Sequence, residues 1–114
     1  MQDWAKELPM AVTITDKDGI VIYMNDKSIE TFQKYGGASV IGSELKSWHN
    51  PNSIDIINSM MTEKKTNSYT ITKNGVKKLI HQTPYFENGE FAGLVEFSIV
   101  FFKLINIAYV NSYH

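Results

Sequence analysis

The most restrictive feature of the sequence is residues 10–25, MAVTITDKDGIVIYMN, in which two alternating apolar runs flank an Asp18-Gly19 pair. β-Branched residues on both sides of an Asp-Gly pair are typical of a β-hairpin, because glycine adopts the positive φ of the turn at little steric cost. Asn25 and Asp26 then follow as helix-capping residues, and the apolar period changes toward helical spacing. This stretch therefore predicts a hairpin that leads directly into a helix.

Three short helices are expected in the middle of the chain, over residues 25–35, 42–48 and 51–65. Their apolar residues recur at i, i+3 or i+4, so each helix has an apolar side to bury. Gly36 suits the end of the first helix, and Pro51 suits the first position of the third.

The period returns to two after Thr66. Strands are predicted over residues 68–72, 76–86 and 91–100, with Asn-Gly turns between them at residues 74–75 and 88–89. The element order is therefore strand, strand, three helices and three strands. This order predicts an α+β fold in which the first hairpin and the last three strands form one five-stranded antiparallel sheet, with short helices covering one face.

Apolar segments flank this predicted core at both ends. Residues 3–8 are expected to form a short cap helix, with a terminus anchored only by Trp4 as the alternative. The apolar residues of 101–109 recur at helical spacing, and this tail either folds back or packs against another chain. We expect a homodimer whose interface uses apolar residues of both ends, namely Trp4, Leu8, Phe101, Leu104, Ile105 and Ala108.

The length of 114 residues predicts a single domain, with a core at about 8–100 and a C-terminal extension at 101–114. Eleven Lys and Arg residues against twelve Asp and Glu residues give a net charge of −1, which excludes a basic field for nucleic acid. The N-terminus lacks a signal-peptide pattern, and residues 94–110 are too polar for a membrane span. A cytoplasmic location is expected.

The chain contains no cysteine. Disulfides, thiolate metal sites, a cysteine nucleophile and a thiol-linked cofactor are therefore excluded by chemistry. The sequence also lacks a Gly-rich phosphate loop and a metal-binding histidine cluster. No catalytic residue and no metal ligand is predicted, and we do not expect an enzyme.

In the order of its motifs the chain resembles a PAS domain. The matching features are the strand at 11–16, Asp18-Gly19 followed by IVIYMN, a helix with Phe32 and Gly36, VIGSEL at 40–45, His49-Asn50-Pro51, and two Gly-turned hairpins. The resemblance implies a sensory or interaction module with a five-stranded antiparallel sheet and flanking helices. Such modules often enclose a small ligand and often dimerise.

The resemblance also bears on the cofactor. Covalent flavin and a thioester-linked chromophore would each need a cysteine, so both are excluded. Haem in this family usually needs a histidine on the helix that corresponds to 51–65, where this sequence has none. His49 and His81 would have to bind iron from unusual positions, so haem is not the expected cofactor.

A pocket for a small organic ligand is expected between the helices and the sheet. Its predicted lining combines aromatic, aliphatic and histidine residues, namely Phe32, Trp48, His49, Ile57, Met60, Tyr69, His81 and Phe97. Two registers remain open for the strand at 76–86, because either its odd or its even residues form a credible inner face. The leading interpretation is a non-catalytic sensor, which signals to a partner protein or through its own dimer. An interaction module with a filled core is the first alternative, and a haem sensor is the second.

Overall fold

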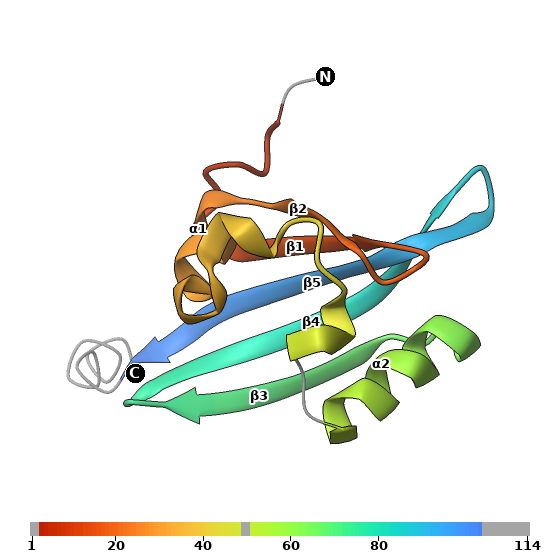
Figure 1. The fold of residues 1–114 in the computed structure, drawn as a ribbon. Coiled ribbons are helices and arrows are strands. Elements are labelled where there is room, and N and C mark those ends of the chain that lie inside the picture. The colour runs from red at the N-terminus through yellow and green to blue at the C-terminus, as the bar shows by residue number, and fades with distance from the viewer. Residues whose placement is uncertain (1–2, 49–50, 104–114) are drawn as a thin grey trace.

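The computed structural model of the chain describes residues 3–48 and 51–103 (Figure 1). Its strands are β1 (Ala11–Asp16), β2 (Val21–Met24), β3 (Asn67–Lys73), β4 (Val76–Glu87) and β5 (Glu90–Lys103). Its α-helices are α1 (Asp26–Thr31) and α2 (Pro51–Glu63). The short 3-10 helices between them are η1 (Gln33–Tyr35), η2 (Gly37–Val40) and η3 (Leu45–Trp48).

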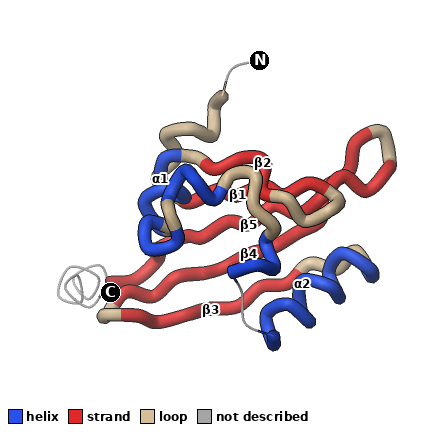
Figure 2. Tube along the Cα trace, in the orientation of Figure 1, coloured by secondary structure: helices blue, strands red, loops and turns tan. Residues whose placement is uncertain are grey.

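All five strands form one antiparallel sheet in the order β2-β1-β5-β4-β3. The N-terminal strand β1 lies beside the C-terminal strand β5 in the centre of this sheet (Figure 2). The prediction that the first hairpin shares a sheet with the last three strands is therefore confirmed.

The predicted turns are also present. Asn74 and Gly75 have φ values of 54° and 76°, and Asn88 and Gly89 have φ values of 51° and 80°. Two consecutive positive φ values are required by the type I′ turn, whose twist matches that of the strands it joins. In the first hairpin, the Asp16 carboxylate accepts hydrogen bonds from the backbone N–H groups of residues 18 and 20, which holds the turn from inside.

The helices cover one face of the sheet, which we call the inner face. Ile57 and Met60 of α2 pack with Leu94 of β5 in one buried cluster. A second buried cluster joins Val21 and Met24 of β2 to η2, with Phe32 and Leu45 packed against it. Because side chains alternate along a strand, the other half of each strand points to the opposite, outer face.

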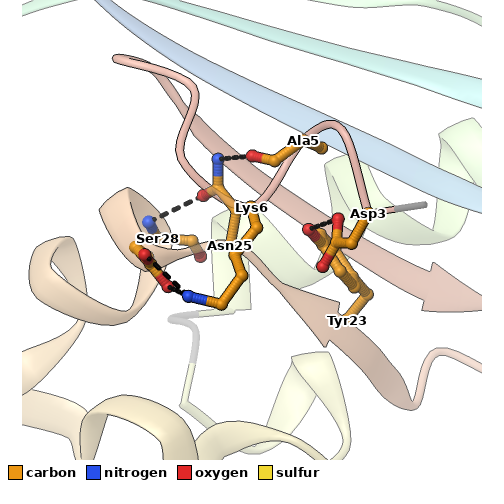
Figure 3. A network of polar contacts seen from close by, with 7 residues as sticks. Asp3, Ala5, Lys6, Tyr23, Asn25 and Ser28 are labelled. Atoms are coloured by element: carbon orange, nitrogen blue, oxygen red, sulfur yellow. Dashed lines mark hydrogen bonds and ion pairs between the residues drawn. The ribbon is translucent and has the colours of Figure 1, made fainter.

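Asn25 links three segments of the fold at one point, which we call the Asn25 junction (Figure 3). Its side-chain oxygen accepts hydrogen bonds from the backbone N–H groups of Val12 at 2.9 Å and Ser28 at 3.0 Å. Its side-chain nitrogen donates to the carbonyl oxygens of Ala5 at 2.9 Å and Met10 at 2.8 Å. Asn25 is thus the N-cap of α1 and also ties α1 to β1 and to the N-terminal segment.

The N-terminal segment forms turns where the sequence predicted a cap helix over residues 3–8. Only bonds between residues three apart are present, from the N–H of Lys6 to the carbonyl of Asp3 and from the N–H of Leu8 to the carbonyl of Ala5. The carbonyls of Ala5 and Lys6 instead accept from Asn25 and from the N–H of Asp26. Tertiary hydrogen bonds have therefore replaced those that a helix would make.

Other boundaries differ from the predictions as well. The first predicted helix divides into α1 and η1, because the N–H of Tyr35 donates to the carbonyl of Phe32, three residues back, instead of continuing the α-helical pattern. The last strand continues to Lys103, so the first three residues of the tail are strand, although the apolar spacing over 101–109 is also compatible with a helix. The rest of the tail, with Leu104, Ile105 and Ala108, lies outside the described residues.

Candidate functional site

The inner face of the sheet carries a row of polar residues directly beneath the helices. Thr13 of β1 pairs with Glu96 of β5, Glu96 pairs with Gln82 of β4, and Gln82 pairs with Asn67 of β3. We call these four residues the polar row. Because paired residues of neighbouring strands point to the same face, the four side chains lie side by side across the sheet.

In the polar row, hydrogen bonds are donated from Asn67 to Gln82 and from Gln82 to Glu96. Asn67 donates from Nδ2 to Gln82 Oε1 at 2.9 Å, and Gln82 donates from Nε2 to Glu96 Oε2 at 2.7 Å. The second bond ends on a carboxylate and is of the stronger, charge-assisted kind. The Glu96 carboxylate is therefore held in a defined position on the inner face.

The fourth member of the polar row connects the sheet to α1. Thr13 shares a hydrogen bond with the hydroxyl of Ser28, which lies fully buried in the first turns of α1. The Asn25 junction fixes the same helix, because Asn25 caps it at the N–H of Ser28. α1 is thus held above the row, and Phe32 follows directly at its C-terminal end.

Two hollows adjoin the polar row, and Phe32 and Glu96 line both of them. The inner hollow holds about 20 Å³ and is lined by residues of β1, β4, β5 and the helices, namely Thr13, Thr15, Phe32, Leu45, Met60, Gln82, Leu94, Val95 and Glu96. The open hollow holds about 180 Å³ and is lined by Thr31, Phe32, Tyr69, Ile71, Lys78, Ile80, Glu96 and Ser98. The first has room for about one water molecule, whereas the second can admit a small organic molecule.

The open hollow combines apolar walls with polar groups of both charges. Phe32, Ile71 and Ile80 form apolar surface, while Glu96 and Lys78 bring a carboxylate and an ammonium group. The pKa of the Tyr69 phenol is raised, first by burial and then by the negative charge of Glu96. Tyr69 therefore remains a protonated hydroxyl at neutral pH and can donate a hydrogen bond.

No protein-family model matches the chain, and a search of curated proteins also finds no match. Solved structures do resemble it. The PAS domain of Bordetella pertussis BvgS is 17% identical, with a TM-score of 0.62 over 94% of this chain and 88% of that chain. The PAS domain of the histidine kinase ThkA is 20% identical, with a TM-score of 0.64 over 79% and 97% of the two chains. The chain has the PAS fold.

A further PAS-fold relative is the Aer2 receptor of Vibrio cholerae, a dual PAS-haem oxygen sensor. It is 13% identical, with a TM-score of 0.60 over 80% of this chain and 93% of that chain. At such low identities, the likeness concerns the fold. The residues of this chain must therefore decide what its own hollows can hold.

Three of the predicted site residues meet in these hollows of the PAS fold. Phe32 lines both hollows, Met60 lines the inner one and Tyr69 lines the open one. Ile57 belongs with Met60 to the buried cluster of α2 and lines neither hollow. Trp48 ends η3, but its side chain lies outside the described part of the structure, as does the whole of His49.

Two other predicted site residues, His81 and Phe97, are not brought to the hollows. They pair with each other on neighbouring strands, one residue away from Gln82 and Glu96, and therefore point to the outer face. The even residues of β4 face the helices, so the register that places His81 inside is contradicted. The physical reason is that both faces of β5 are partly buried, and apolar character alone could not identify the inner one.

The polar row is the part of the site that sequence reasoning missed. In β5, Glu96 and Ser98 alternate with Val95, Phe97 and Ile99, and such alternation usually places the polar residues in solvent. Here the polar residues face the helices. Gln82 was a signal, because the residues two positions away on the same face of the strand, Ile80 and Pro84, are apolar, and a polar group between them can orient a ligand.

The outer face of the sheet holds the histidine that the structure describes in this PAS-fold chain. His81 is the one histidine among residues 3–48 and 51–103, and it faces away from both hollows. The open hollow also lies below the roughly 300–1,000 Å³ of drug-sized ligand pockets. Within those residues no group of three or more His, Cys, Asp or Glu side chains is placed to hold a metal ion.

The predicted dimer residues lie at the two ends of the described chain. Trp4 is 76% exposed and Phe101 is 54% exposed, whereas Leu8 is partly buried. Among the described helices, none is both long enough and apolar enough to cross a membrane.

Proposed function

We propose that this PAS-fold chain is a sensory module that binds a small organic molecule in the open hollow. The observation that carries the proposal is a hydrogen-bonded polar row beside an unfilled space of about 180 Å³. Removing a polar group from water costs free energy unless the group is paired. If the space beneath the helices were only a hydrophobic core, apolar residues would be favoured at the positions of the polar row. Polar groups beside free space are the usual form of a ligand site.

The helix that covers the hollow gives the module a way to respond. Phe32 lies at the end of α1, and α1 is attached to the sheet by the Thr13–Ser28 hydrogen bond and the Asn25 junction. A ligand that contacts both Phe32 and the sheet favours one position of this helix over others. The response would then reach a partner protein or a second copy of the chain.

A fragment screen by amide-resolved NMR tests the ligand site. We expect fragments to shift resonances of α1, β4 and β5, and we expect Ser98→Phe to abolish these shifts, because Ser98 lines the open hollow. Thr70→Phe adds the same ring at an exposed position of β3 and serves as the matched control. Ser98→Leu, a smaller filling change, covers the case in which Ser98→Phe unfolds the domain.

Two outcomes would contradict the ligand proposal. One is a screen in which no fragment shifts the resonances around the hollow of the wild-type chain. The other is fragment binding that Ser98→Phe and Ser98→Leu leave unchanged. Either result would favour the alternative of an interaction module with a filled core.

Self-association is the second part of the proposal. The outer face of β5 carries Val95, Phe97 and Ile99, and Phe101 near the end of the strand is 54% exposed. Exposed apolar surface of this kind marks interaction sites. We expect Phe101→Glu to raise the dissociation constant of the dimer in sedimentation equilibrium. Phe86 is 51% exposed and lies at the opposite end of the β4–β5 hairpin. Phe86→Glu is therefore the control and should leave the dissociation constant unchanged. A wild-type chain that sediments as a monomer would overturn this part.

We also propose that the chain is not an enzyme. Ser68 and His81 share a hydrogen bond and are the described pair that most resembles a nucleophile with its base. They lie on the outer face, away from both hollows, with Ser68 exposed. A pair of this kind needs a substrate site beside it, and neither Ser68 nor His81 lines either hollow or the larger one of about 590 Å³ beside the β4–β5 turn.

A further inference from the structure

The charge distribution of the open hollow defines the kind of molecule that it would accept. This inference rests on the proposed ligand-binding function and adds the chemical class of the ligand. It starts from Glu96, the anionic residue that lines both hollows.

The direction of the hydrogen bonds in the polar row makes this end of the hollow an acceptor. Asn67 donates to the oxygen of Gln82, which turns the Gln82 amide so that its nitrogen donates to Glu96. A carboxylate can accept up to about four hydrogen bonds and donates none. The complementary ligand group is therefore a donor, and a cationic donor is favoured most.

The other residues that line the open hollow suit a small cation with an apolar body. The ring of Phe32 lies on the same hollow as Glu96, and an aromatic face attracts a nearby ammonium group. Ile80 and Ile71 continue as apolar surface along β4 and β3. Ser98 and Tyr69 also line the open hollow, and their hydroxyls can accept or donate further hydrogen bonds.

Lys78 limits the ligand to one positive charge. It lies on the same face of β4 as Gln82 but four residues away, which corresponds to about 13 Å along a strand. Its ammonium group repels a second cationic centre at that end of the hollow. A diamine or polyamine that extended along β4 would meet this charge, whereas a monoamine would not.

We propose that the open hollow binds a small organic monoamine, with the protonated amino group against Glu96 and the apolar body between Phe32 and Ile80. The amino group joins the hydrogen bonds that Glu96 already makes. Gln82 acts as a positioning residue, because it orients the carboxylate, and Lys78 sets selectivity against longer polycations.

Titration of the full chain with defined probes tests this class. The probes are 2-phenylethylamine and 3-methylbutylamine, their neutral counterparts 2-phenylethanol and 3-methylbutanol, the anion 3-phenylpropionate, and the diamine 1,5-diaminopentane. Amide-resolved NMR at neutral pH gives both the dissociation constant and the location of binding. We expect the monoamines to bind at the hollow at least about tenfold more tightly than the other probes, as a charge-assisted contact requires.

Variants identify the residues responsible. Glu96→Gln keeps the shape and removes the charge, and we expect it to raise the dissociation constant of the monoamines at least about tenfold while the alcohols are unaffected. Glu90→Gln makes the same change at an exposed residue of the same strand and should have no effect. Lys78→Met should improve binding of 1,5-diaminopentane relative to 3-methylbutylamine.

The possible failures are distinguishable. If the alcohols or 3-phenylpropionate bind at the hollow as tightly as the monoamines, or if Glu96→Gln binds the monoamines unchanged, the amine class is wrong but ligand binding stands. If no probe and no screened fragment shifts the resonances around the hollow, the proposed function fails together with the amine class.

Discussion

The Asn25 junction and the polar row are two polar sites inside the same small fold, and they differ in what surrounds them. Asn25 is 1% exposed, and its side chain makes four hydrogen bonds to backbone groups. The polar row is linked by two side-chain hydrogen bonds and adjoins the two hollows. One site joins segments of the fold, whereas the other borders free space.

This difference distinguishes a polar group that serves the fold from one that serves a ligand. A buried side chain whose donors and acceptors are all satisfied by backbone leaves no group for a second molecule to recognise. A carboxylate can accept up to about four hydrogen bonds, so one that lines an open space can accept from a further donor on the side of that space. The predictions below test whether the two sites separate in this way.

The largest effect is expected from Asn25→Ala. The substitution leaves two N–H groups and two carbonyls without their partner in a buried place, and we expect a loss of about 3–5 kcal/mol in the free energy of unfolding. Urea unfolding measures it. Asn58→Ala, at an exposed position of α2, is the control and should change stability by less than about 0.5 kcal/mol. If Asn25→Ala lowers the free energy of unfolding no more than the control does, then the Asn25 junction does not stabilise the fold.

A smaller loss is expected from Ser28→Ala, which removes the partner of the buried Thr13 hydroxyl. An unsatisfied hydroxyl costs about 1–3 kcal/mol. Thr13→Val removes the other partner, and the double variant should lose less than the sum of the two single variants. Chemical denaturation of all four proteins gives the coupling. Additive losses would mean that the Thr13–Ser28 hydrogen bond contributes nothing to stability.

A still smaller effect is expected in the polar row itself. Gln82→Met conserves most of the volume, and water from the hollows can reach Glu96 in place of the lost amide. We expect a change in the free energy of unfolding below about 1 kcal/mol. If urea unfolding gives a loss as large as that of Asn25→Ala, then the row is structural and the distinction between the two sites fails.

The last effect is a loss of stability at alkaline pH and concerns the N-terminal segment beside the junction. Burial, a hydrogen bond to Asp3 and the charges of Asp3 and Asp26 raise the pKa of Tyr23 to about 12. In the unfolded chain the pKa of tyrosine is about 10. The folded state therefore holds the phenolic proton more tightly, and this contribution to stability is full below the unfolded pKa and is lost as pH rises through the folded pKa.

Tyr23→Phe isolates that contribution. We expect the stability difference between wild type and Tyr23→Phe to be constant near neutral pH and to shrink as the pH rises above about 10. The other tyrosines titrate in both proteins, so their effect cancels. A difference that stays constant up to alkaline pH would mean that the Tyr23–Asp3 contact does not persist in solution.

The sequence alone determined the order of the elements and the places where the chain turns. Asn74-Gly75 and Asn88-Gly89 predicted tight hairpins because few residues tolerate consecutive positive φ values, and Asn25 predicted a helix start because its side chain can cap backbone N–H groups. These are local properties that need no knowledge of distant segments. The turns at residues 3–8 were not predictable in this way, because hydrogen bonds to the distant Asn25 and Asp26 decide them.

Only the tertiary structure decided which face of the sheet lies beneath the helices. Alternation in β5 separates Glu96 from Phe97 with certainty, but it does not say which of the two points inward. Pairing with β1 and β4, and the position of the helices above them, turned Glu96 and Ser98 inward and Phe97 outward. The candidate ligand site depends on that choice, and a choice made by contacts between distant strands is not encoded in the local pattern of any one of them.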